Sequence, residues 1–231
     1  IVFDMGSNDT SEELDPAFEP GRDPDEWQHT VVLSDSLVSV VTEVTQSQWI
    51  GLGLSNPSHF TDSTAQPVES VSWLQAIEYC NALSVDDGRT AVYTINGEDV
   101  TWDQTADGWR LPTEAEWEWL CRGGSSTTFA GGPLTGRVCN DDPVLNLTGW
   151  YCGSIFPGTP ATSEVEQKAP NSKGLYDMHG NVWEWCWDWY GDYRIADADG
   201  DGVILDPTGA VSGFQRVIRG GSWYGGSEDC R

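Results

Sequence analysis

The chain has 231 residues, 38% of them hydrophobic and 13 of them tryptophan, which is enough to bury a sizeable core in a single domain spanning residues 1–231. It carries 37 Asp and Glu residues against 11 Lys and Arg, a formal net charge of −26. So acidic a surface disfavours nucleic acid as a partner, and the lack of any run of about 18 apolar residues argues against a membrane span.

The first third of the chain predicts strands followed by two helices. Residues 29–45 are rich in Val, Leu and Thr, which favours strands. The stretch "TQSQWIGLG" predicts a short helix capped by Thr45. The stretch "SVSWLQAIEYCNALS" predicts an amphipathic helix capped by Ser70 or Ser72.

The middle of the chain predicts a hairpin, a third helix and a long loop. Asn96-Gly97 marks a hairpin turn, and in "RLPTEAEWEWLCRGG" Thr113 and Glu116 have the spacing of a capping box. Residues 125–173 are rich in Gly, Pro, Ser, Thr and Asn, so we expect a loop-rich insert there, and "QRVIRGGSW" predicts a last strand. These helices and the many short strands predict an α+β fold with little regular structure.

The stretch "GLYDMHGNVWEWCWDWYG" alternates four tryptophans, from Trp183 to Trp189, with polar or small residues. Alternation of this kind predicts a strand with one buried face, and we expect the tryptophans to fill the core. Glu184 then belongs to the opposite face of the strand.

The six cysteines include no CxxC pair, which argues against a zinc knuckle or a thioredoxin-like motif. An even number of cysteines in an acidic chain favours disulfides and an extracytoplasmic location, secreted or at the cell surface. The cysteines are Cys80, Cys121, Cys139, Cys152, Cys186 and Cys230.

Four segments, "VTEVTQSQW", "RLPTEAEWEWLCRGG", "GLYDMHGNVWEW" and "RVIRGGSW", occur in an order and spacing that resemble the sulfatase-modifying factor family, the formylglycine-generating-enzyme domain. The resemblance covers nearly the whole chain. It implies a variant of the C-type lectin fold, with little regular structure and often steadied by calcium. Family members continue into an Arg-rich stretch that closes on a "GFR"-like strand, which this sequence lacks before Arg231. Truncation or a strand from another chain would each account for the difference.

The resemblance also implies a copper site that this chain has lost in part. Catalytic members carry a cysteine pair after Gly-Gly-Ser that binds copper and activates oxygen, which then oxidises a substrate cysteine. Here the second cysteine corresponds to Cys230, whereas the first corresponds to Gly225. Thiolates hold Cu(I), so we expect copper to bind poorly. If the chain is an enzyme nonetheless, Ser222 and Cys230 are the positions that the resemblance recommends.

The resemblance maps a calcium site onto the side chains of Asp177 and Glu184 and the main-chain oxygens of Gly180 and Val182. Such a set of oxygens suits calcium, although both carboxylates could instead cap loops. Asn181 is a weaker candidate ligand.

Two other metal sites have weaker support. The family's second calcium site needs an Asn in the long insert, for which Asn140, Asp141, Asp142 and Asn146 are candidates. It also needs a later Asp, but residues 153–171 contain no aspartate. The stretch "DADGDG" resembles half of an EF-hand loop, but Thr208 stands where the loop needs a glutamate, and a solvated acidic turn explains the stretch equally well. Its candidate ligands are Asp197, Asp199 and Asp201.

Two disulfides are candidates. Cys186 and Cys230 both flank the region that matches the family's site, which makes them our first candidate pair. Cys139 and Cys152 enclose a short loop and form the second. For Cys80 and Cys121, mutual pairing, partners elsewhere and buried thiols all remain open.

Together these observations predict a secreted or cell-surface domain, stabilised by calcium, that has lost copper catalysis and serves binding or assembly. Its partners would be a protein, a small molecule, a glycan or neighbouring subunits. The alternatives are a metal-dependent oxidoreductase of the same family and a structural subunit of an extracellular assembly.

Overall fold

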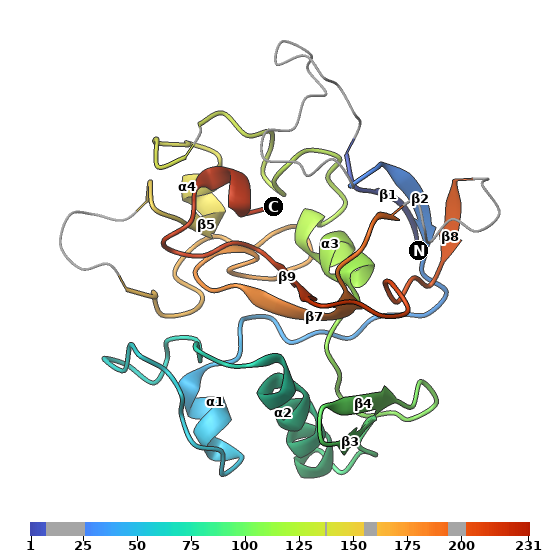
Figure 1. Ribbon diagram of the computed structural model, residues 1–231. Coiled ribbons are helices and arrows are strands. Elements are labelled where there is room, and N and C mark those ends of the chain that lie inside the picture. The colour runs from blue at the N-terminus through green and yellow to red at the C-terminus, as the bar shows by residue number, and fades with distance from the viewer. Residues whose placement is uncertain (8–25, 137, 155–160, 194–201) are drawn as a thin grey trace.

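The computed structural model describes residues 1–7, 26–136, 138–154, 161–193 and 202–231 (Figure 1). The helices are α1 Gln46–Gly51, α2 Trp73–Asp86, α3 Glu114–Arg122 and α4 Leu145–Thr148, with a 3-10 turn at Ser227–Asp229. The strands are β1 Val2–Met5, β2 His29–Val32, β3 Tyr93–Asn96, β4 Asp99–Trp102, β5 Gly149–Trp150, β6 His179–Gly180, β7 Glu184–Trp189, β8 Val203–Leu205 and β9 Arg216–Arg219.

The strands form four small sheets in the described residues, which agrees with the expected α+β class. β2 pairs antiparallel with β1 and parallel with β8, β3 and β4 form a hairpin, β5 and β6 pair in parallel, and β7 pairs antiparallel with β9. Figure 1 shows α3 on one side of the β7–β9 pair, with α1, α2 and the β3–β4 hairpin gathered on the other side.

The predicted helix starts are confirmed. The side chains of Thr45, Ser72 and Thr113 each accept a hydrogen bond from the backbone N–H three residues later. The side chain of that later residue accepts a hydrogen bond from the backbone N–H of the N-cap residue. α3 ends at Gly123, whose left-handed backbone suits glycine.

The strand prediction for residues 29–45 holds only at its beginning. β2 ends at Val32, and residues 33–44 form no strand. Their backbone is held at single points, such as the bond that the Tyr176 N–H donates to the Val41 oxygen. A strand-favouring sequence remains unpaired here because no second strand lies beside it.

The prediction that the tryptophans of β7 fill the core is wrong in its choice of face. Cys186 and Asp188 are the fully buried residues of β7, while its tryptophans are half-buried and Trp183 is 41% exposed. Cys186 packs with Trp117 of α3 on one side of the strand. The tryptophans cover the other side, where they meet α2 and the hairpin, so both faces of β7 are covered.

The tryptophan face is closed by aromatic and cationic stacking. Trp187 stacks on Tyr93 with ring centroids 5.2 Å apart. The Arg216 guanidinium lies 3.8 Å from the Trp73 ring and 3.7 Å from the Trp189 ring, so it is sandwiched between the two.

Arg219 ties β9 to α3 through buried ion pairs. Its guanidinium lies 2.9 Å from the Glu118 carboxylate and 3.4 Å from that of Glu114. Glu26 lies 3.5 Å from Arg219 and 2.6 Å from Arg231, which joins the N-terminal segment to the same cluster. Buried charges of this kind are tolerated because each acid meets an arginine.

Asp188 is a buried acid of β7 that makes stability depend on pH. Burial and the neighbouring Glu114 raise its pKa to about 8. A carboxyl that holds its proton in the folded state, but loses it near pH 4 when unfolded, stabilises the fold at low pH and stops doing so as pH rises towards 8.

We therefore expect Asp188→Asn to flatten the fall in the free energy of unfolding between pH 5 and pH 8, by on the order of 2 kcal/mol. Urea titrations at both pH values measure this, with Asp99→Asn on the surface as control. An unchanged pH slope in Asp188→Asn would contradict the assignment.

Candidate functional site

The loop from Asp177 to Glu184 has an unusual backbone. Asp177 and Asn181 have φ angles of 59° and 62°, and Gly180 has a φ of 104°. A Cβ atom on Gly180 would lie 1.8 Å from the Trp150 oxygen, so only glycine fits against β5. The turn therefore brings the peptide groups and acidic side chains of the loop into a small volume.

Asp177 is 2% exposed and incompletely bonded. Its Oδ2 accepts a hydrogen bond from the Glu166 N–H at 2.8 Å, whereas its buried Oδ1 has no partner among the described residues. Burial, with a contribution from Glu166, raises the pKa of this carboxyl. An unpaired buried carboxylate oxygen indicates a missing cation or hydrogen-bond donor.

Glu184 lies at the other end of the loop, at the start of β7. Its Oε2 accepts a hydrogen bond from the Trp117 indole N–H at 3.0 Å. Burial and the nearby Asp177 raise its pKa to about 7. The two carboxylates that the resemblance assigns to calcium are thus brought together in the fold.

A third carboxylate, Glu43, belongs to the same cluster and was not predicted. It accepts hydrogen bonds from the Asn181 side-chain N–H₂ at 2.7 Å and from the Val182 N–H at 3.0 Å. Burial, then Asp177 and Glu184, raise its pKa well above the usual value. Glu43 is 138 residues away from Asn181 in the sequence, and its only local signal is an acid within an otherwise apolar run.

Asn181 holds loops together with its side chain. Its Oδ1 accepts a bond from the Ser163 N–H at 2.8 Å, and its Nδ2 donates to Glu43. Both ends of the amide therefore have hydrogen-bond partners within the protein.

The loop fits a calcium ion. No three His, Cys, Asp or Glu side chains in the described ranges are grouped to hold a metal, so a cation here depends on carbonyl oxygens. The carboxylates of Asp177 and Glu184 with the carbonyls of Gly180 and Val182 supply the hard oxygens that calcium takes. The orphaned Asp177 Oδ1 and the mutual repulsion of the acids favour such an ion.

The remaining metal candidates have other partners or lie outside the description. Asp142 accepts hydrogen bonds from four backbone N–H groups, including those of Thr135 and Leu145, so its carboxylate is satisfied. The Lys168 ammonium donates to the Asn146 carbonyl at 2.7 Å and lies 4.3 Å from the Trp150 ring, so the positive charge beside Asn146 comes from this lysine. Asp197, Asp199 and Asp201 lie outside the described residues.

The segment from Gly220 to Cys230 does not fit copper. Cys230 is fully buried, burial raises the pKa of its thiol, and its Sγ lies 3.5 Å from the Gly226 oxygen. Gly225 offers no thiol, and a Cβ there would meet the Asp229 carboxylate at 2.9 Å. A single buried, protonated thiol is a poor ligand for Cu(I).

The imidazole beside Cys230 is not free to act as an activating base. The nearest imidazole, His179, donates from Nδ1 to the Cys230 carbonyl and accepts at Nε2 from the Ala130 N–H. Burial lowers the pKa of His179 to about 4, so the ring is neutral and both of its nitrogens are engaged. It holds the C-terminal segment in place and takes no proton from a nucleophile.

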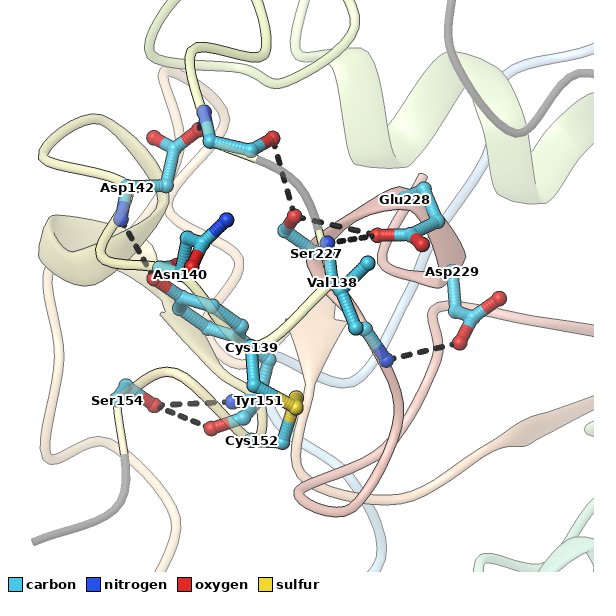
Figure 2. Close-up of a disulfide and its surroundings, with 12 residues drawn as sticks. Val138, Cys139, Asn140, Asp142, Tyr151, Cys152, Ser154, Ser227, Glu228 and Asp229 are labelled. Atoms are coloured by element: carbon cyan, nitrogen blue, oxygen red, sulfur yellow. Dashed lines mark hydrogen bonds between the residues drawn. A yellow bond between two sulfur atoms is a disulfide. The ribbon is translucent and has the colours of Figure 1, made fainter.

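The predicted Cys139–Cys152 disulfide is present (Figure 2). The predicted Cys186–Cys230 disulfide is wrong, because both cysteines are free. Cys186 packs beneath α3 with Cys121, whereas Cys230 packs with Phe129 and belongs to a different part of the core. Both remain free, buried thiols, as do Cys80 and Cys121. Position along the sequence could not show that the two cysteines face different clusters.

The disulfide braces the segment that replaces the cysteine pair. The Cys152 N–H donates to the Gly225 oxygen at 3.0 Å, and the Ser227 N–H donates to the Val138 oxygen at 2.9 Å. Figure 2 shows Val138 and Glu228 joined by a further bond, from the Val138 N–H to the Glu228 carboxylate at 2.7 Å.

Comparison with known proteins gives consistent matches. Residues 9–231 match the family described as the sulfatase-modifying factor enzyme 1-like domain. The chain is 38% identical over 185 residues to the chaperone protein LppX of Paenibacillus barcinonensis, which covers 69% of this chain and 64% of LppX. It is 34% identical over 169 residues to the formylglycine-generating enzyme of Thermomonospora curvata, which covers 72% of this chain and 47% of that enzyme. The chain thus spans about half to two thirds of the length of these relatives.

A solved structure extends the match to the fold. Treponema denticola variable protein 1 superposes with a TM-score of 0.79 and 36% identity, over 100% of this chain and 84% of that chain.

The disulfide yields a prediction. Replacing Cys139 and Cys152 by serine frees a loop closed over 13 residues, which costs about 3 kcal/mol of stability. We expect the thermal midpoint to fall by roughly 5–10 °C, with faster hydrogen exchange at Gly225 to Ser227. The matched control, Cys186→Ala, removes a cysteine that forms no disulfide. Unchanged exchange at Gly225 to Ser227 in the double serine variant would contradict the bracing role.

Proposed function

The chain belongs to the sulfatase-modifying factor family, and from that membership and its formylglycine-generating-enzyme-like fold we propose that it is a calcium-stabilised, non-catalytic binding domain working outside the cytoplasm. The observation that carries the proposal is the segment from Gly225 to Cys230. It keeps the position of the family's cysteine pair but holds one buried thiol, braced by a disulfide.

Loss of copper chemistry follows from the residues at this segment. With Gly225 in the first position, one of the two expected sulfur ligands is missing. The remaining thiol is enclosed and keeps its proton, while oxygen activation by Cu(I) needs thiolates open to substrate. The relative from Thermomonospora curvata is named a formylglycine-generating enzyme, and one fold can serve several functions.

A recognition role is supported by an aromatic surface beside the same segment. Tyr224 is 76% exposed, and its ring packs on Trp223, which in turn packs edge-on against Phe60. His59 extends this row of rings. Exposed aromatic side chains on a braced scaffold suit a protein or glycan ligand. One relative is named a chaperone and another a variable protein, and both names accord with binding.

The extracytoplasmic location rests on the disulfide and the charge. A disulfide persists in oxidising compartments, and a net charge of −26 keeps a secreted domain soluble. None of the helices in the described ranges has the length and apolar character of a membrane span.

Calcium binding gives the first test of the proposal. An ion that binds only the folded state stabilises it, by about 2.7 kcal/mol at a concentration of 100 Kd. We expect chelation with EGTA to lower the thermal midpoint, and calcium but not magnesium to restore it. Asp177→Asn should abolish this calcium response, while Asp99→Asn, an exposed control, should keep it. A thermal midpoint that EGTA leaves unmoved would rule calcium out.

Copper gives the second test. We expect the wild-type protein, loaded with Cu(I) and then dialysed against a Cu(I) chelator, to retain no stoichiometric copper and to consume no oxygen with a cysteine-containing peptide. Gly225→Cys restores the second thiol and should retain Cu(I) at least ~10-fold more tightly, because thiolates hold that ion. Gly226→Cys serves as the matched control. Stoichiometric copper and peptide oxidation in the wild-type protein would establish an oxidase and overturn the proposal.

A further inference from the structure

A large groove is lined by α2, by residues 36–44 and by the loop that leads into β7. Its volume is about 690 Å³, and most of the side chains that line it are apolar. They include Val38, Leu83, Leu120, Met178, Trp185 and Ile218. Cavities of this size commonly hold a ligand.

One wall of the groove is the segment from Ser36 to Val41, whose sequence favours a strand but which has no strand partner. Val38 is 81% exposed, and Val40 and Val41 are about half exposed. Such valines are stable in a sheet and unfavourable in water, so this segment is suited to pairing with an added strand.

The facing wall is also exposed and apolar. Ile218 of β9 and Trp183 both line the groove, and each keeps about two fifths of its side chain open to solvent. Ile218 stands opposite Trp185 across the β7–β9 pair, which extends the apolar floor. Exposed apolar side chains on two facing walls mark an interaction site.

The charges around the groove indicate what kind of chain it binds. Glu69 and Asp107, whose side chains are partly or fully exposed, line it and form an acidic rim. The arginines that line it are already paired, Arg89 with Asp87 and Arg110 with Glu116. In a chain of net charge −26, such a groove attracts basic side chains.

We propose that this groove binds an extended segment of another protein, with alternating apolar and basic residues, that pairs as a strand with residues 37–41. The added backbone pairs with the peptide groups of residues 37–40, which have no backbone partner among the described residues, its apolar side chains cover Ile218 and Trp185, and its basic side chains meet the acidic rim. The inference rests on the proposed role as a binding domain and names the partner's chemistry. A second copy of this chain is disfavoured, because two chains of −26 repel each other.

The test uses the full chain in calcium and three fluorescein-labelled decapeptides. One alternates Val and Arg, one has the same composition with the five Val and five Arg in separate blocks, and one alternates Val and Glu. We expect the alternating Val-Arg peptide to bind at least ~10-fold more tightly than the other two by fluorescence anisotropy. Hydrogen exchange at residues 37–41 should slow when this peptide binds.

Matched variants locate the binding. Val38→Asn with Val40→Asn should weaken the alternating peptide at least ~10-fold, whereas Val211→Asn with Phe214→Asn, two fully exposed residues that do not line the groove, should leave it unchanged. Equal binding of the alternating and block peptides, or equal effects of the two double variants, would overturn the proposal.

Other occupants of the groove have their own signatures. Amides at 37–41 that are protected before any peptide is added would mean that the protein fills its own groove. A wild-type dimer that the Val38 and Val40 substitutions dissociate would mean that a second copy fills it. Either result contradicts the proposal but leaves the calcium and copper tests of the proposed function intact, so the two can fail separately.

Discussion

The acids Glu43, Asp177 and Glu184 are buried and repel one another, and the loop from Asp177 to Glu184 is built around that constraint. Charge removed from water is costly unless hydrogen bonds or an opposite charge compensate it. Each acid therefore accepts a hydrogen bond from a different part of the chain. Glu43 accepts from the Asn181 side chain, Asp177 from the Glu166 backbone and Glu184 from the Trp117 indole of α3. The loop that carries two of the acids thus joins the N-terminal segment, the long insert and the main helix.

A comparison within the molecule shows why hydrogen bonds alone leave this loop incomplete. Glu118 of α3 is equally buried, yet its pKa is lowered, because Arg122 and Arg219 outweigh the effect of burial. The loop has no arginine of this kind, and the pKa values of its acids rise. The first cluster contains arginines, whereas a calcium ion is the cation that we propose for the second. That difference is the physical basis for placing calcium at Asp177 and Glu184.

Local features of the fold were predictable from the sequence, while contacts between distant segments were not. The capping box of α3 and the Cys139–Cys152 loop depend on residues near one another in the chain, and both were predicted, while the cap of α2 was narrowed to Ser70 or Ser72. The role of Glu43 and the separation of Cys186 from Cys230 depend on how remote segments pack, which spacing does not encode. The choice of face on β7 failed for a related reason, since a strand covered on both sides has no single buried face.

A crystal structure of the protein grown in calcium, with anomalous diffraction measured at a long wavelength, tests this account most directly. We predict one anomalous peak within the loop, within about 2.3–2.6 Å of Asp177 Oδ1, the carbonyl oxygens of Gly180 and Val182, and a Glu184 oxygen. A loop of the same conformation without a peak, in which a protein donor or water bonds Asp177 Oδ1, would contradict it.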